Sequence, residues 1–194
     1  EEMGNWREYT YERLETVGFN TIGNWSDTLF YRDAKMPYTY TLDSRKDERL
    51  LMANRLPDVF HPDWEQHLTE TFAEIARFKN DPYLLGYFVD NEMGWRSITR
   101  LDSASYTFEA LRGKPAEEQM GLYAERYFST ISAAIEQHDP NHLYMGCRFT
   151  RNFRMMQPVA EAAGRYVDVL SINVYSAYPI REQIDQWFEA AQKP

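Results

Sequence analysis

The chain has 194 residues and a formal net charge of −9 at pH 7, with 43% hydrophobic and 15% aromatic residues. This length predicts one domain with a sizeable core, and the negative charge argues against nucleic acid or an anionic membrane surface as a partner. No run of about 18 apolar residues occurs, so no membrane-spanning helix is expected. The single cysteine, Cys147, excludes an internal disulfide, and the four histidines lack a metal-ligand spacing, so we expect no metal site.

Helical and extended patterns alternate along the chain. Apolar residues three and four positions apart indicate amphipathic helices, and short apolar runs between them are typical of buried strands. Gly and Asp-Pro sequences mark the ends of several of these segments. In chain order we expect a helix at 6–17, strands at 19–23 and 37–42, a helix at 62–80, a strand at 84–89, a helix at 120–138, a strand at 143–147, a helix at 158–166, a strand at 167–174 and a helix at 181–191.

This alternation predicts an α/β fold with a parallel sheet, because strands separated by helices and apolar on both faces are typical of such sheets. No glycine-rich phosphate loop follows an early strand, which argues against a dinucleotide-binding sheet. A (β/α)8 TIM barrel needs roughly 250 residues. We therefore expect a TIM barrel truncated to roughly the second through sixth βα units, with 1–194 as one partial barrel domain that lacks N- and C-terminal units.

Polar and aromatic residues follow every predicted strand. In a (β/α)8 barrel the active site lies at the C-terminal ends of the strands, so these residues are expected to converge. The candidates are Asn24, Trp25 and Asp27 after the first strand, Asn91, Glu92 and Trp95 after the third, Arg148 after the fourth, and Asn173 and Tyr175 at the end of the last.

These side chains suit the cleavage of a glycosidic bond. A carboxylic acid such as Glu92, with a raised pKa, can protonate the leaving oxygen, and Asn91 can hydrogen-bond a neighbouring ring hydroxyl. Trp25 and Trp95 can stack on apolar sugar faces. Structural alternatives remain for several residues: both tryptophans can be packing groups, and Arg148 can pair with an acidic neighbour. For Asp90 we favour a capping role.

Four motifs carry a resemblance to a known family. Residues 85–92, Leu-Gly-Tyr-Phe-Val-Asp-Asn-Glu, resemble the fourth-strand motif of clan A glycoside hydrolases, in which Asn-Glu carries the acid/base group. Residues 18–27, 81–88 and 171–176 look like the corresponding motifs of the β-agarases of glycoside hydrolase family 50. The resemblance implies a barrel, retention of anomeric configuration, no metal or cofactor in the chemistry, and Glu92 as the catalytic acid/base.

The same resemblance implies the remaining functional expectations. Tyr175 matches an aromatic position that commonly contacts the nucleophile, and the nucleophile itself, a Glu after the seventh strand, is expected outside this chain. The substrate would be a neutral galactan polysaccharide or oligosaccharide, first of all the β-1,4 bonds of agarose, and the location would be secreted or periplasmic. The alternatives are a β-galactosidase-like enzyme of the same clan acting on short substrates, and a non-catalytic polysaccharide-binding barrel. The oligomeric state stays open.

The polar segment 93–119 interrupts the alternation directly after Glu92. It is longer than a usual βα loop of 2–6 residues, and long loops in compact domains often carry function. It contains Trp95, Arg96, Arg100, Tyr106 and Phe108, and we expect it to face the substrate. A surface insertion without contact to the substrate is the alternative.

Overall fold

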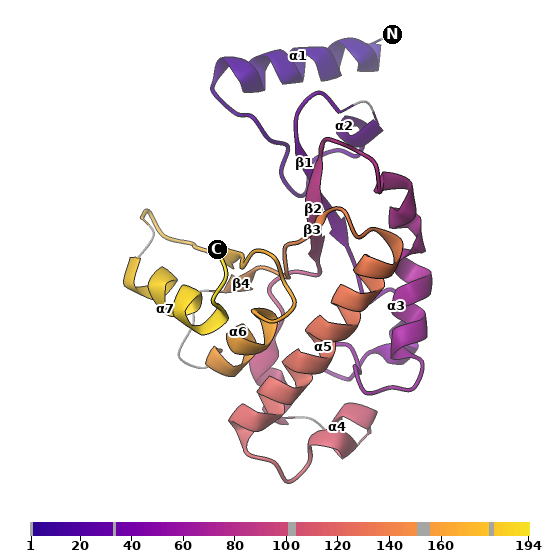
Figure 1. The fold of residues 1–194 in the computed structure, drawn as a ribbon, viewed down its shortest axis with the longest axis vertical. Helices are drawn as coiled ribbons and strands as arrows, with labels where there is room; N and C mark the ends of the chain where they lie inside the picture. Colours follow the sequence, from indigo (N-terminus) through magenta and orange to yellow (C-terminus); the bar gives the residue numbers. More distant parts are fainter. Residues whose placement is uncertain (1, 33, 101–103, 151–155, 179–180) are drawn as a thin grey trace.

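The computed structural model describes residues 2–32, 34–100, 104–150, 156–178 and 181–194, and it shows a mixed α/β fold (Figure 1). Short strands lie at the centre. In the view of Figure 1, α3 and α5 lie to the right of them, and α6 and α7 lie at the lower left, near β4. The elements, with η for 3-10 helices, are α1 (Glu2–Thr16), α2 (Leu29–Arg32), β1 (Tyr38–Leu42), η1 (Glu48–Leu50), α3 (Trp64–Phe72), η2 (Ala73–Phe78), β2 (Leu84–Val89), η3 (Trp95–Arg100), α4 (Tyr106–Leu111), α5 (Ala116–His138), β3 (Leu143–Tyr144), β4 (Phe149–Thr150), α6 (Gln157–Ala163), β5 (Ile172–Asn173) and α7 (Arg181–Ala191).

The strands are parallel, and neighbours in the sheet are also neighbours in the sequence. One sheet has the order β1-β2-β3, and β4 pairs with β5 in a second sheet. Upstream, Ile22 forms an isolated parallel bridge with Tyr38. Helical segments separate β1 from β2, β2 from β3, and β4 from β5, so the predicted parallel α/β alternation is confirmed.

The helices follow the sequence prediction more closely than the strands do. The predicted strand at 143–147 is interrupted after Tyr144, because Gly146 (φ 73°) and Arg148 (φ 50°) adopt left-handed backbone conformations that a strand cannot contain. The predicted strand at 167–174 shortens to Ile172–Asn173. The predicted strand at 19–23 reduces to the single bridge at Ile22.

The core is built around α5, the longest helix, whose buried face contacts α3, α6 and η3. Trp64 of α3 is fully buried, and its indole N–H donates to Thr130 Oγ1 of α5 at 2.8 Å. Gly86 permits close contact between β2 and β3, since a Cβ there would lie 2.2 Å from the Leu143 carbonyl oxygen. In the parts of the chain that the structure describes, no helix combines the length and apolar character needed to cross a membrane.

The segment 93–119 forms η3 and α4, both of which contact α5. Ser105 caps α4 by accepting a hydrogen bond from Phe108 N at 3.0 Å, and buried Asp58 accepts one from Thr107 N at 2.7 Å. Part of the segment is therefore anchored to the core, whereas Arg96, Arg100 and Tyr106 are exposed. Residues 101–103 of this predicted substrate-facing excursion lie outside the described residues.

Candidate active site

Glu92 joins the ends of β2 and β5. It follows β2 by three residues, and its Oε1 accepts hydrogen bonds from Asn173 Nδ2, at 2.5 Å, and from the Tyr175 hydroxyl. Its backbone N–H donates to the carbonyl oxygen of Cys147 at 3.1 Å. Three predicted site residues, Glu92, Asn173 and Tyr175, are thus brought together although 81 residues separate the first from the second.

These contacts set the protonation behaviour of the carboxyl group. The hydrogen bonds from Tyr175 and Asn173, and more weakly the positive charge of Arg148, lower the pKa of Glu92 from its ordinary value because all three favour the charged form. The raised pKa expected for a general acid is therefore not present in this arrangement. These contacts favour the charged carboxylate form of Glu92.

Left-handed backbone conformations gather at this site. Six non-glycine residues in the described part of the chain have positive φ, and four of them are Trp25 (69°), Asp90 (56°), Glu92 (44°) and Arg148 (50°). Such conformations cost of order 1–3 kcal/mol each and persist where the surroundings enforce them, typically at functional sites. The concentration of these residues at neighbouring strand ends marks the region as a candidate site independently of residue type.

Arg148 stacks between two aromatic rings. Its guanidinium carbon lies 5.1 Å from the centre of the Trp25 ring and 4.9 Å from that of Phe88. Trp25 is 70% exposed, so one aromatic surface stays open to solvent. Burial lowers the pKa of Arg148, while the negative charge of Glu92 raises it. This arrangement fits the predicted platform at Trp25 and assigns Arg148 to stacking instead of a salt bridge.

Several polar atoms at these strand ends are buried without a hydrogen-bond partner in the described structure. They are Asn24 Nδ2, Asn91 Oδ1, and Arg148 Nε and Nη2. Asn24 uses its other side-chain atom, Oδ1, to accept from Thr39 Oγ1 at 2.7 Å. Unpaired buried groups are rare and costly in folded proteins. The set includes both donors and an acceptor, which matches the hydroxyl groups of a sugar.

Known proteins of similar sequence and structure include several that are named agarases. β-Agarase A of Vibrio sp. (strain JT0107) is 27% identical and aligns with 88% of this chain, and β-agarase B of the same organism is 24% identical over the same share. The crystal structure of an agarase, AgWH50C, superposes on 99% of the chain with a TM-score of 0.80 and 27% identity. The structure of PfGH50B gives a TM-score of 0.78 with 26% identity over 99% of the chain.

The chain is similar to the β-agarases of glycoside hydrolase family 50. No protein-family model matches it. The agarase-like chain spans 24% of the length of the two curated relatives, 34% of AgWH50C and 36% of PfGH50B. The likeness therefore supports a fold shared with these agarases and a relationship to them.

Trp95 of the agarase-like chain is a core residue, which corrects its prediction as a sugar platform. Only 2% of it is exposed, and its ring packs against Tyr123, Tyr127, Phe128 and Phe149 at centroid distances between 5.4 and 6.1 Å. A tryptophan enclosed on these sides has no free face for a sugar ring. Its position in η3, which packs on α5, explains why the side chain points inward.

Asp27 lies two residues before α2, and its Oδ1 accepts a hydrogen bond from Leu29 N, at the start of that helix, at 2.9 Å. This contact is typical of an aspartate that caps a turn, and contact with substrate stays a prediction for Asp27. Asp168, outside the site, binds the backbone N–H of Tyr144 at 2.8 Å.

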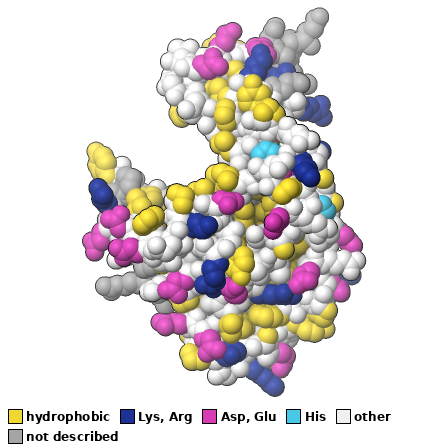
Figure 2. Space-filling model, viewed as in Figure 1, with side chains coloured by type: hydrophobic (Ala, Val, Ile, Leu, Met, Phe, Trp, Pro, Cys, Tyr) yellow, Lys and Arg dark blue, Asp and Glu magenta, His cyan; other side chains and the backbone are white. Residues whose placement is uncertain are grey.

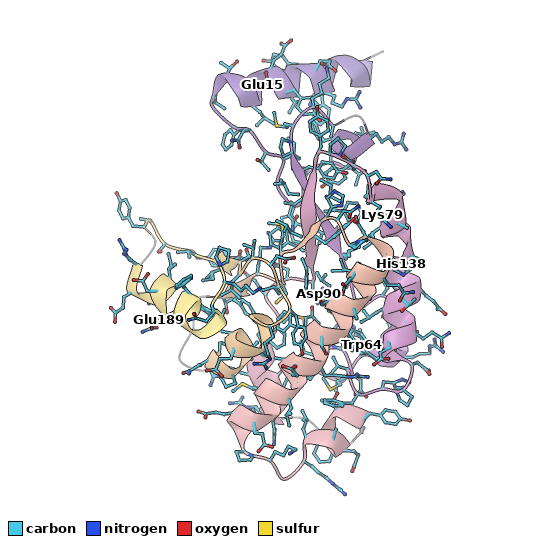
Figure 3. The ribbon with its side chains drawn as sticks, in the orientation of Figure 1. Glu15, Trp64, Lys79, Asp90, His138 and Glu189 are labelled. Carbon is cyan, nitrogen blue, oxygen red and sulfur yellow. The ribbon has the colours of Figure 1, made fainter. Side chains whose placement is uncertain are left out.

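Asp90 was predicted as a capping residue, but the structure shows a buried junction of three elements. Its carboxylate accepts from Ser44 N at 2.9 Å, Ser44 Oγ at 2.6 Å and the Tyr127 hydroxyl at 2.7 Å. Asp90 thereby ties the end of β2 to the turn after β1 and to α5, and Figure 3 shows it between the strands and that helix. The sequence offers one signal for this role, an aspartate directly after an apolar strand, but not its partners.

Proposed function

We propose that this chain supplies part of the active site of a retaining glycoside hydrolase that cleaves a β-linked galactan, with Glu92 as acid/base. The observation that carries the proposal is the contact of Glu92 with Asn173 and Tyr175 at the ends of β2 and β5. The likeness to agarases, in both sequence and structure, supports the choice of substrate class. Agarose β-1,4 bonds are the first candidate because the relatives are named β-agarases.

The proposed architecture is a (β/α)8 barrel, of which 1–194 forms roughly the second through sixth units. Consecutive parallel strands, together with superposition on 99% of the chain by agarase structures, support it. In such a barrel the carboxyl ends of all strands face one cleft. Trp25, Asn24 and Asn91 would line that cleft with their exposed ring or unpaired polar atoms. A polymeric galactan substrate implies a secreted or periplasmic enzyme.

The proposed reaction is a double displacement. The protonated Glu92 gives its proton to the glycosidic oxygen as a second carboxylate attacks the anomeric carbon, forming a covalent glycosyl-enzyme and releasing the first sugar product. Glu92, now a carboxylate, takes a proton from a water molecule that attacks the same carbon, and the nucleophile leaves. The resemblance to the family 50 agarases implies that the second carboxylate is a Glu after the seventh strand of the complete barrel, outside this chain.

The test uses a protein in which this chain is continued to a complete barrel, alongside the 194-residue chain alone. The chain alone should not cleave agarose, because retention needs two carboxyl groups about 5–5.5 Å apart. In the complete barrel, Glu92→Gln should reduce cleavage of agarose by about 10²–10⁴-fold. The loss should be much smaller for the glycosylation step of an aryl galactoside, whose leaving group departs without a proton. Azide should restore turnover of the aryl substrate, since it attacks the glycosyl-enzyme without a base.

Glu117→Gln is the matched control, since Glu117 is exposed in the first turn of α5. It should leave both rates unchanged. Equal losses on both substrates for Glu92→Gln, or turnover by the 194-residue chain that depends on Glu92, would contradict the proposed roles. A panel of agarose and short β-galactosides distinguishes an agarase from a β-galactosidase-like enzyme of the same clan.

A non-catalytic polysaccharide-binding barrel is the second candidate. The lowered pKa of Glu92 favours it, because a group held as a carboxylate can bind hydroxyl groups without giving up a proton. In that case the complete barrel would bind agaro-oligosaccharides without turnover, and Trp25→Ala would weaken binding. Binding of a sugar ring to Trp25 does not require proton transfer by Glu92. The two candidates therefore differ in whether the loss of Glu92 abolishes turnover.

A further inference from the structure

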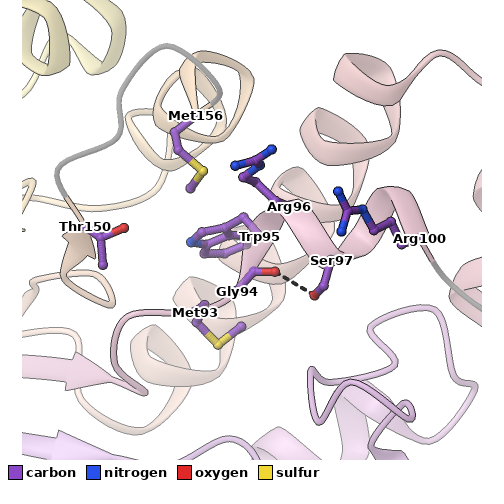
Figure 4. Close-up of a pocket in the computed structure, with 8 residues that line it drawn as sticks. All are labelled: Met93, Gly94, Trp95, Arg96, Ser97, Arg100, Thr150 and Met156. Carbon is purple, nitrogen blue, oxygen red and sulfur yellow. Dashed lines mark hydrogen bonds between the residues drawn. The ribbon is translucent and has the colours of Figure 1, made fainter.

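A pocket of about 460 Å³ opens beside the Glu92 site and has no role in the proposed reaction. Figure 4 shows its wall, which combines the start of the 93–119 segment with residues after β3 and before α6. The lining residues are Met93, Gly94, Trp95, Arg96, Ser97, Arg100, Thr150 and Met156.

The pocket adjoins the candidate active site through two strand ends. Met93 and Gly94 directly follow Glu92 in the chain. On the opposite wall, Thr150 of β4 is the register partner of Asn173, the residue that donates to Glu92. The pocket wall and the Glu92 site therefore share neighbouring residues at two strand ends.

Three side chains of the pocket, Arg96, Arg100 and Trp95, can only donate hydrogen bonds. Arg96 and Arg100 are exposed, and neither belongs to an ion pair or side-chain hydrogen bond within the part of the chain that the structure describes. Trp95 is 98% buried and its Nε1, which can only donate, has no partner. By contrast, Ser97 is already used, because its hydroxyl donates to the Gly94 carbonyl at 2.6 Å and accepts from Asn54.

The charge of this pocket is opposite to that of the protein. The chain carries 30 acidic and 21 basic residues, yet no Asp or Glu is among the described residues that line the pocket. Several arginines elsewhere are paired with carboxylates, as Arg126 is with Glu65 at 2.7 Å, and Figure 2 shows blue and magenta side chains interspersed over the face in view. Two arginines without such partners, in an acidic protein, indicate a place for an anion from outside the chain.

We propose that this pocket binds an oxyanionic substituent of a sugar chain, a sulfate ester or a carboxylate, and so lets the protein accept charged galactans. Guanidinium groups bind both anions through paired N–H···O bonds. The N–H groups of Arg96, Arg100 and Trp95 distinguish the pocket from the Glu92 region, where unpaired donors and an acceptor match neutral hydroxyls. The inference that the anionic group is attached to a sugar chain rests on the proposed function, whereas binding of the anionic group itself does not.

The test measures binding to the 194-residue chain by calorimetry, with galactose 6-sulfate, galacturonic acid, inorganic sulfate and neutral galactose as separate probes. Galactose 6-sulfate or galacturonic acid should bind at least tenfold more tightly than galactose, and raising NaCl from 0.1 to 0.5 M should weaken that binding because charge contacts are screened. The ratio between the two charged sugars identifies which anion the pocket prefers. Inorganic sulfate should compete with both.

The double variant Arg96→Ala, Arg100→Ala should lose at least tenfold in affinity for the charged sugars and leave galactose unchanged. The double variant Arg49→Ala, Arg181→Ala removes two exposed arginines that are paired with Asp47 and Asp185; it is the control for net charge and should have no effect. Both variants alter exposed side chains, so equal melting temperatures are expected. Charged and neutral sugars binding alike, or equal losses in the double variant and the control, would overturn the proposal. Glu92→Gln should leave anion binding intact, which separates failure of this pocket from failure of the proposed catalytic role.

Discussion

Replacing Asp90 should cost more stability than any other substitution near the site, because its carboxylate organises three separate elements. The side chain is fully buried and accepts hydrogen bonds from Ser44 N, Ser44 Oγ and the Tyr127 hydroxyl, with Arg45 Nε at 3.5 Å. Asp90→Ala leaves three donors without a partner. An unpaired buried donor costs about 1–3 kcal/mol, and three donors lose their acceptor in this variant. We expect a loss of about 4 kcal/mol in the free energy of unfolding.

Asp90→Asn should cost less, about 1–2 kcal/mol, because the amide oxygen still accepts two of the three hydrogen bonds. The pH dependence of this cost follows from the pKa. Burial raises the pKa of Asp90 above its ordinary value of 3.8, against the opposing hydrogen bonds from Ser44 and Tyr127. Between 3.8 and the folded pKa, the native state therefore holds more protons than the unfolded state, and the wild-type stability falls as pH rises. The cost of Asp90→Asn should shrink over that window.

Urea denaturation followed by circular dichroism measures these differences. Asp63→Asn is the control, since the Asp63 side chain is 69% exposed and makes no capping hydrogen bond, and it should cost no more than about 1 kcal/mol. A double-mutant cycle of Asp90→Asn with Tyr127→Phe should give a coupling energy of about 1 kcal/mol. A loss below about 1 kcal/mol for Asp90→Ala, or a cost of Asp90→Asn that grows with pH, would refute the reasoning.

Two further substitutions test the packing and the site. Gly86→Ala should destabilise the chain by about 3 kcal/mol, because its Cβ would meet the Leu143 carbonyl oxygen at 2.2 Å; Gly23→Ala, with nothing within 4 Å of the added Cβ, is the matched control in urea denaturation. Tyr175→Phe removes the largest cause of the lowered pKa of Glu92, so that pKa should rise in a carboxyl-specific NMR titration. A fall in the Glu92 pKa in this variant would show that the Tyr175 hydroxyl does not stabilise the carboxylate.

Local sequence signals were sufficient for the helices near the C-terminus, whereas the predicted helix at 62–80 divides into α3 and η2, and α2 and α4 were not predicted. The predicted helix at 181–191 coincides with α7, and the predicted helix at 120–138 lies within α5, which begins earlier at Ala116. Both have apolar residues at helical spacing and end at clear breaks, so their boundaries depend on nearby residues alone. The strand 84–89 was also predicted correctly, because its apolar run is bounded by Asp-Pro before it and polar residues after it.

The details that decide the site depend on distant residues. Asp90 accepts a hydrogen bond from Ser44, which lies 46 positions earlier in the chain. No sequence pattern connects these two residues. Whether Trp95 faces the solvent or the core depends on how η3 packs on α5. The direction of its side chain could therefore not be predicted from its position after β2 alone. The stacking of Arg148 on Trp25 joins residues 123 positions apart, and left-handed backbone at both is imposed by the fold.

The lowered pKa of Glu92 can be reconciled with a role as general acid through the second carboxyl group. Retaining enzymes place two carboxyl groups about 5–5.5 Å apart, and a nearby negative charge raises the pKa of its neighbour. In the complete barrel the nucleophile would thus oppose the effects of Tyr175 and Asn173 on Glu92. When the nucleophile becomes an uncharged ester in the glycosyl-enzyme, that opposition disappears, and the pKa of Glu92 falls towards the value it has in this chain. The hydrogen bonds from Tyr175 and Asn173 to Glu92 therefore favour the second half of the proposed reaction, in which Glu92 would act as a base.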